Sequence, residues 1–187
     1  AAIVSTASFA ALRRPRWTAA ALALAIPPAA LIAPFYIPQT ARAGDRDSQT
    51  VTLISANLFG DNADFGWFVR YAQEKNPALL LLQEYTAEAD VQLSAALDDW
   101  PYRYVYVRPN HLGQAIYSKV PLFETQTHWF AFPGFATLTA EIEWSGRRIA
   151  LINTHPVPPG SAEHSRARNT ELEALPTLIT DVPTVLA

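Results

Sequence analysis

The sequence has no cysteine and no methionine among its 187 residues. The absence of cysteine excludes disulfides, thiolate metal sites and cysteine nucleophiles. Because no initiator methionine is present, we expect the chain to be a piece of a longer translation product. Half of the residues are apolar and 17% are charged. This balance excludes wholesale disorder and suits one domain with an accessory segment.

Acidic residues are missing from positions 1–43, which carry Arg13, Arg14, Arg16 and Arg42. The rest of the chain therefore has 10 basic and 17 acidic side chains, a net charge of −7 with histidine neutral. Proteins that grip long nucleic acid need the opposite balance, since affinity grows with the number of neutralised phosphates. The composition disfavours sequence-independent DNA binding by this part.

Charges are also missing between Trp17 and Ala41. The apolar stretch Trp17–Ile37 is long enough to cross a hydrocarbon core of about 30 Å, although Pro27-Pro28 removes backbone hydrogen bonds in its middle. We expect residues 1–43 to be a membrane anchor with its span at about 17–37, followed by a linker at 44–50. The arginines before the span predict a cytoplasmic start, so the downstream domain would lie outside the cytoplasm.

Two alternatives to a retained anchor stay open. Ala41-Arg42-Ala43 before Gly44 resembles a signal-peptide cleavage site, and Arg13-Arg14 faintly resembles a twin-arginine signal. Cleavage after Ala43 would release a secreted protein. The stretch could also be a buried helix of a soluble protein.

Apolar patterning predicts an α/β layered sandwich for residues 51–187. Helices are expected where apolar residues recur at helical spacing or where a capping residue begins a polar run, and strands where apolar, aromatic and β-branched residues cluster. The expected helices are 64–75, 86–97 and 161–175. The expected strands are 51–56, 78–83, 102–107, 113–118, 122–129, a hairpin of 137–144 with 147–153, and 183–187.

Three polar residues follow predicted strands and are the candidate site residues: Asn57, Glu84 and His155. Such positions are where α/β sandwiches collect their sites. A carboxylate at the edge of a core, as at Glu84, calls for a partner such as a hard divalent cation. His155 is able to donate to a phosphoryl oxygen or to shuttle a proton.

Each of these residues also has a structural interpretation. On spacing alone, Glu84 fits a carboxylate that emerges into solvent, and Asn57 fits an Asx turn. His155 fits equally a structural histidine bonded to a backbone carbonyl. His111, His128 and His164 show no metal-ligand spacing, so we expect them to be surface or structural residues.

The order of four sequence segments along the chain favours the functional interpretation of Asn57, Glu84 and His155. The segments VTLISANLFGDN, ALLLLQEYT, LGQAIYSKVPL and IALINTHPVPP follow one another along the chain. In this order they resemble the endonuclease/exonuclease/phosphatase superfamily, in particular its membrane-anchored bacterial members. The resemblance covers residues 50–187 and implies two packed mixed β-sheets flanked by helices.

The resemblance also implies a site. Glu84 would ligate a catalytic Mg²⁺ or Mn²⁺, Asn57 would help to set the metal and phosphate site, and His155 would contact the scissile phosphate. Two features depart from the family pattern: the chain ends where a Gly-Asp-x-Asn motif is expected, and no acidic residue precedes Gly113. What orients His155 is therefore open, and we expect residues 1–187 to be inactive by themselves.

The sequence as a whole predicts a metal-dependent hydrolase of phosphate esters, tethered to a bacterial inner or plasma membrane with its catalytic domain extracytoplasmic. Its partners would be a phosphate-ester substrate, whether a small molecule, a lipid derivative or a nucleic acid, and the membrane; no protein partner is inferred. A non-catalytic, membrane-anchored binding module of the same fold is the alternative from another class. The joint presence of Asn57, Glu84 and His155 argues against it, because binding alone does not require all three.

Overall fold

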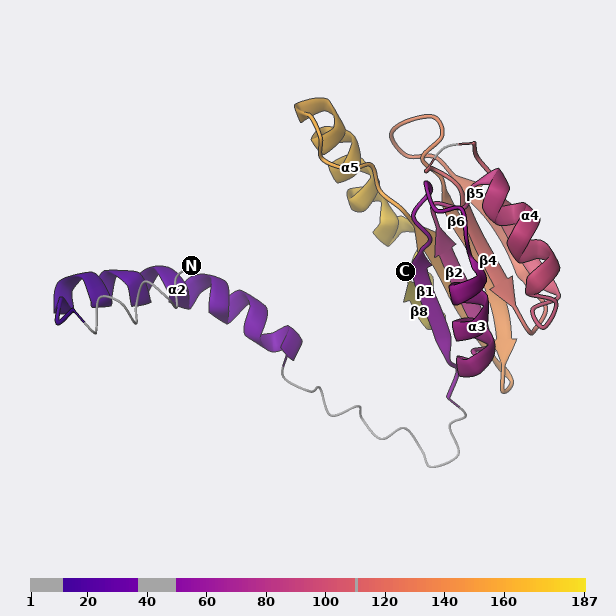
Figure 1. Ribbon diagram of the computed structural model, residues 1–187, viewed down its shortest axis with the longest axis horizontal. Coiled ribbons are helices and arrows are strands. Elements are labelled where there is room, and N and C mark those ends of the chain that lie inside the picture. The colour runs from indigo at the N-terminus through magenta and orange to yellow at the C-terminus, as the bar shows by residue number, and fades with distance from the viewer. Residues whose placement is uncertain (1–11, 37–49, 110) are drawn as a thin grey trace. The chain divides into compact units, whose positions relative to one another are not determined.

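The computed structural model describes residues 12–36, 50–109 and 111–187. The chain divides into two units, Ala1–Ser48 and Gln49–Ala187. The described part of the first unit contains one long helix, and the second unit contains two β-sheets with their covering helices (Figure 1).

Helix α2 (Pro15–Tyr36) is the apolar segment of the first unit. Residues Pro15–Ala33 are long and apolar enough to cross a membrane, a test that a signal sequence near the N-terminus also passes. The helix continues through Pro27-Pro28, as apolar helices do when the freed carbonyls are satisfied in another way. The predicted cleavage position after Ala43 and all but Thr50 of the predicted linker lie outside the described residues.

The described part of the second unit contains two four-stranded mixed sheets, which confirms the fold class predicted from the sequence. In each sheet one pair of neighbouring strands is parallel, β1–β2 in the first and β7–β8 in the second, and the other pairs are antiparallel. The first sheet has the order β1 (Leu53–Asn57), β2 (Leu79–Gln83), β4 (Gln114–Ser118), β3 (Tyr102–Tyr106). The second has the order β5 (Phe123–His128), β6 (Thr137–Trp144), β7 (Arg147–Thr154), β8 (Thr184–Leu186).

The helices of the second unit lie close to their predicted positions. They are α3 (Gly66–Lys75), α4 (Ala87–Ala96) and α5 (Ala162–Ala174), followed by the short 3₁₀ helix η1 (Leu175–Leu178). The hydroxyl of Thr86 accepts a hydrogen bond from the Ala89 amide and caps α4, as predicted. Helix α3 begins two residues later than expected; the Asp64 carboxylate accepts a hydrogen bond from the Gly66 amide just before it.

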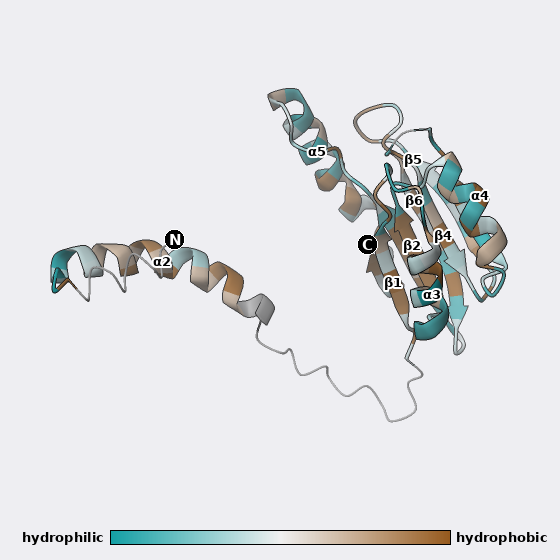
Figure 2. Ribbon diagram, in the orientation of Figure 1, coloured by the Kyte–Doolittle hydropathy of each residue, from teal (hydrophilic) through white to brown (hydrophobic). Residues whose placement is uncertain are grey.

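Strand β2 is the centre of the core because its four leucines are buried on both faces. Leu80 and Leu82 pack with residues of α3 and α4, whereas Leu79 and Leu81 pack against the second sheet. Figures 1 and 2 show α3 and α4 over one face of the first sheet and the hydrophobic strands beneath them. This two-sided burial explains the continuous apolar run of β2, since successive side chains of a strand point to opposite faces.

Gly113 lies where β4 passes the backbone after β2. Its carbonyl accepts a hydrogen bond from the Tyr85 amide at 2.8 Å. A Cβ atom at position 113 would lie 1.9 Å from the Tyr85 carbonyl oxygen, which no side-chain movement can relieve. Glycine is therefore required at this position.

We expect Gly113→Ala to lower the free energy of unfolding by about 3 kcal/mol, the upper end of the usual cost of overpacking. The control is Gly160→Ala, because the nearest atom to a Cβ at position 160 is 3.9 Å away. Chemical denaturation of both variants measures the difference. Equal stability of the two variants would contradict the close approach at Gly113.

Candidate functional site

Asn57 and Glu84 meet because β1 and β2 are parallel, so that their carboxyl ends share one edge of the sheet. Asn57 is paired in register with Gln83, the residue before Glu84. The side-chain amide of Asn57 donates to Glu84 Oε1 at 2.7 Å, and its Oδ1 accepts from the Phe59 amide at 2.8 Å. Asn57 therefore forms the Asx turn that its position suggested and also contacts the candidate carboxylate.

Glu84 is held with its carboxylate largely shielded from solvent. Its side chain is 13% exposed, and the Gly60 amide donates to its Oε2 at 2.7 Å. Burial raises the pKa of the Glu84 carboxyl, but the hydrogen bonds from Asn57 and Gly60 and the neighbouring histidines lower it by more, so the pKa lies below its ordinary value. The carboxylate is thus ionised at neutral pH.

The backbone of Glu84 adopts a left-handed conformation with φ of 56°. This region costs a residue other than glycine on the order of 1 kcal/mol or more, and it clusters at functional sites. The conformation turns the chain sharply after β2. It explains why Glu84 does not simply continue out into solvent.

Two histidines approach the same carboxylate. His155 Nε2 lies 3.4 Å from Glu84 Oε1, and His111 Nδ1 lies 3.4 Å from Glu84 Oε2. His111 Nε2 also lies 3.1 Å from Asp61 Oδ1. The sequence suggested the position of His155 but not that of His111, because no motif ties a residue before β4 to Glu84.

A buried amide pair lies between the sheets directly behind these residues. Gln83 Nε2 donates to Asn153 Oδ1 at 2.6 Å, and the Asn153 amide donates to the carbonyls of Leu82 and Ala115. Gln83 is 6% exposed and Asn153 is fully buried. Because Gln83 precedes Glu84, and Asn153 stands two residues before His155, this pair fixes the distance between the two candidate residues.

Helix α5 adds a second support to the end of β7. Glu171 Oε1 accepts hydrogen bonds from the hydroxyls of Thr137 and Thr154, and the Glu171 side chain is buried. Burial raises the pKa of Glu171, and these hydrogen bonds offset part of that effect. Thr154 precedes His155, so α5 positions the histidine through this contact. The sequence showed only a polar helix here.

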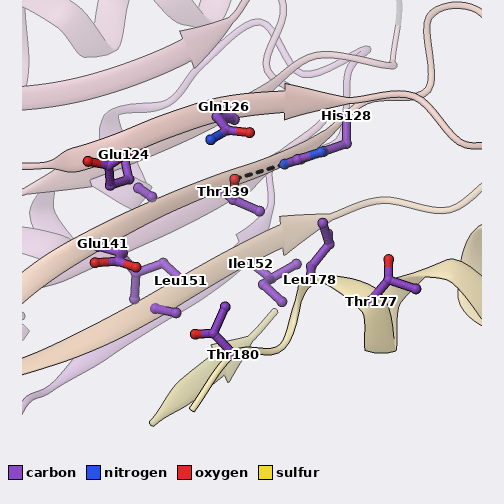
Figure 3. A pocket seen from close by; sticks show the side chains of 12 residues that line it. Glu124, Gln126, His128, Thr139, Glu141, Leu151, Ile152, Thr177, Leu178 and Thr180 are labelled. Carbon is purple, nitrogen blue, oxygen red and sulfur yellow. Dashed lines mark hydrogen bonds between the residues drawn. The ribbon is translucent and has the colours of Figure 1, made fainter. Parts of the chain in front are cut away.

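A cavity of about 230 Å³ lies on β5, β6 and β7 beside η1 (Figure 3). His128 lies in it and contacts the Thr139 hydroxyl at 3.0 Å. Burial lowers the pKa of His128. The cavity contains none of Asn57, Glu84 and His155, so it is separate from the candidate site, and the structural interpretation of His128 stands.

The chemistry of Glu84 fits a magnesium or manganese ion better than zinc. Among the residues described, no group of three or more histidine, aspartate or glutamate side chains has the arrangement of a protein-made metal cage. Mg²⁺ does not need such a cage, since it is usually bound by one or two carboxylates, waters and substrate phosphate. Each Glu84 oxygen accepts one hydrogen bond and retains lone pairs for such an ion.

A sequence model of the Endonuclease/Exonuclease/phosphatase family matches residues 54–187, which is more than half of the chain and does not include α2. No curated protein matches the chain in sequence.

Solved structures share the fold at low sequence identity. TDP2 of D. rerio, humanized by 14 mutations, is 17% identical with a TM-score of 0.62, over 73% of this chain and 59% of that one. An endonuclease/exonuclease/phosphatase from Beutenbergia cavernae is 16% identical with a TM-score of 0.58, over 73% of this chain and 46% of that one. Sphingomyelinase C from Streptomyces griseocarneus is 19% identical with a TM-score of 0.52, over 75% and 64%. The chain thus spans about half the length of the first two.

We expect Asn153→Leu to lower the free energy of unfolding by about 3 kcal/mol, because it removes the hydrogen bonds that the buried Asn153 amide makes with Gln83, Leu82 and Ala115. Asn169→Leu, at an exposed position on α5, is the control and should change stability by less than about 0.5 kcal/mol. The double variant Gln83→Leu/Asn153→Leu should lose less than the sum of the single losses. Denaturation curves that show additive losses would contradict the coupling.

Proposed function

The chain belongs to the Endonuclease/Exonuclease/phosphatase family, whose name denotes enzymes that hydrolyse phosphate esters, and we propose that residues 49–187 carry the phosphate site of a metal-dependent phosphoester hydrolase. The observation that carries the proposal is the arrangement around Glu84. An ionised, shielded carboxylate is held by Asn57 and Gly60, with His155 and His111 beside it.

Glu84 would hold a Mg²⁺ or Mn²⁺ ion, with Asn57 fixing the orientation of the carboxylate. When bound, the ion supplies neutralisation of charge on the phosphoryl oxygens. The hydrogen bonds that keep Glu84 ionised favour this role, since a protonated carboxyl would not bind a cation. The strained backbone at Glu84 is consistent with a residue retained for its side chain.

His155 would contact the scissile phosphate through its ring nitrogens. Its side chain is 24% exposed, so one face is shielded while a ligand can still reach it. As an imidazolium it would stabilise charge on a phosphoryl oxygen, and as an acid it would donate a proton to the leaving oxygen.

The charge of the protein favours small substrates. The net charge of −7 after residue 43 opposes the phosphate backbone of long duplexes. We propose a small or lipid-derived phosphoester as the substrate, and infer no protein partner. We also propose that residues 1–187 are inactive by themselves, because Glu84 is the one carboxylate at the site that is shielded from solvent among the residues described.

We expect Glu84→Gln to reduce hydrolysis of an activated phosphodiester by at least about 10²-fold, the scale of one lost electrostatic contact in the transition state. The reaction is measured with Mg²⁺ or Mn²⁺ in a full-length protein that contains this chain. Glu88→Gln is the matched control, because Glu88 is an exposed carboxylate in the first turn of α4.

Two results would contradict the assignment. One is full activity of the Glu84→Gln protein, and the other is wild-type activity that persists in EDTA. A third result would favour the alternative of a non-catalytic binding module. In that case the wild-type protein and the Glu84→Gln protein would both bind a phosphoester, and neither would hydrolyse it.

We propose that α2 anchors the domain in a bacterial inner or plasma membrane, with residues 49–187 extracytoplasmic. The supporting observations are its length, its apolar composition and the arginines at its start, Arg13, Arg14 and Arg16. The alternative is a cleaved signal that releases a secreted nuclease.

We expect the expressed protein to stay in the membrane fraction after alkaline extraction, because α2 spans the bilayer. Leu24→Arg, in the middle of α2, should reduce insertion, since a central arginine costs about 3 kcal/mol on the translocon scale. Protease added to spheroplasts should digest residues 49–187. A soluble product whose N-terminus is Gly44 would show that the segment is a signal.

A further inference from the structure

The loop between β5 and β6 is rich in aromatic residues and has no aspartate, glutamate, lysine or arginine. Residues 129–135 read WFAFPGF, and we call them the aromatic loop. Trp129 keeps 55% of its surface exposed, and Ala131 and Pro133 are exposed as well. Exposed apolar side chains that gather in one place mark a surface that another partner covers.

Ring contacts order the base of the aromatic loop. The rings of Tyr106 and Trp129 meet edge to face with centroids 6.2 Å apart. Phe132 packs against Phe135 and against His164 of α5, with centroids 6.4 and 5.9 Å apart. Trp129 remains exposed in spite of its contact, and the loop extends beyond the ends of the strands (Figure 1). A surface that is already ordered loses less entropy when it binds.

The aromatic loop lies at the same edge of the second unit as the candidate site. It leads into Thr137, which pairs with Thr154, and His155 follows directly. Phe59, just after β1, is 62% exposed and has a left-handed backbone with φ of 60°. Such a conformation is unusual for a bulky residue and is found at functional segments. One edge therefore combines the site with exposed aromatic side chains from both sheets.

The charge beside the aromatic loop suits the head groups of lipids. Positions 125–140 contain no aspartate or glutamate. Arg108 lies close to the loop, since its Nη2 atom is 3.6 Å from the place of a Cβ at Gly134. Arginine beside tryptophan and phenylalanine is typical of surfaces that bind at the membrane interface. The net charge of −7 after residue 43 gives no attraction to anionic lipid, so burial of rings has to provide the binding energy.

The proposed membrane anchor supplies the partner. Tyr36, the last residue of α2, and Thr50 are 14 positions apart, so the chain between them spans at most about 50 Å. A tether of this length keeps the second unit at a high effective concentration near the bilayer surface. Tryptophan is one of the side chains that favour the membrane–water interface. A lipid surface is therefore the occupant that the chain itself holds nearby.

We propose that the aromatic loop docks on the surface of the lipid bilayer, with Trp129 at the membrane–water interface. Docking turns the edge that contains Glu84 and His155 toward the lipid. The inference rests on the proposed anchor for the nearness of the bilayer, and it does not depend on the proposed hydrolysis.

The test uses one fluorescent label at a single introduced cysteine, which the absence of other cysteines allows. Ala131→Cys places the label on the aromatic loop. Ala95→Cys is the matched control, because α4 begins at Ala87 beside the site and leads away from it to an exposed Ala95. The chain is reconstituted in phosphatidylcholine nanodiscs, with and without a phosphatidylcholine that has a nitroxide quencher near its head group. We expect the emission at position 131 to shift to shorter wavelength and to be quenched, and the emission at position 95 to do neither.

Substitutions in the labelled Ala131→Cys chain test the part of the aromatic ring. Trp129→Ser should lower the ratio of docked to undocked loop at least about tenfold, the scale of burying half of an indole ring. Trp129→Phe keeps a ring and should retain that ratio within about threefold, which separates loss of the ring from misfolding. Tyr102→Ser removes an exposed aromatic residue at the opposite end of the first sheet, where it pairs with Ser118, and should have no effect.

Equal quenching at positions 131 and 95 would overturn the inference, as would quenching at 131 that Trp129→Ser leaves unchanged. A shift at 131 without quenching by the nitroxide lipid would overturn it in favour of a protein occupant, such as a second copy of the chain. Quenching at 131 on added phosphatidylcholine vesicles, in a chain that begins at Gly44, would leave the docking surface standing while the proposed anchor fails.

Discussion

The hydrogen bond between Gln83 and Asn153 is the interaction on which the site depends. It joins two sheets that meet largely through apolar side chains, whose contacts are not directional. A few other hydrogen bonds, such as the one between the hydroxyls of Tyr104 and Thr127, also cross between the sheets. Sliding of one sheet against the other would break this bond and the bonds of Asn153 to two carbonyls of the first sheet. Gln83 is the residue before Glu84, and Asn153 stands two residues before His155. The relative position of the two sheets therefore determines the distance between Glu84 and His155.

The cost of this arrangement is concentrated in a few residues. Glu84 has a left-handed backbone and a shielded charge, and both are unfavourable without the donors from Asn57 and Gly60. Gly60 has a further constraint, because a Cβ there would lie 2.8 Å from the His111 ring. The site therefore combines strain, close packing and a pair of hydrogen bonds within one short loop and one strand end.

The sequence predicted most of the fold, because its strands have continuous apolar runs and its helices have capping residues such as Thr86 and Ser161. It also identified Asn57, Glu84 and His155 as candidate site residues, since each is a polar residue that directly follows a predicted strand. It did not predict that His111 would lie beside Glu84 or that Glu171 would support the end of β7. Their positions depend on which loops and helix faces come into contact in the folded protein. The spacing of residues along the chain does not predict those contacts. The coupling of Gln83 with Asn153 is of the same kind, because 70 residues separate the two amides.

The central claim is that Glu84 holds a divalent cation, and anomalous diffraction from crystals soaked in Mn²⁺ tests it most directly. The account predicts an anomalous peak at about 2.2 Å from a carboxylate oxygen of Glu84, within the range of such metal–oxygen bonds, and its loss in crystals of the Glu84→Gln protein. A peak that persists in Glu84→Gln, or Mn²⁺ bound only at other residues, would contradict the account.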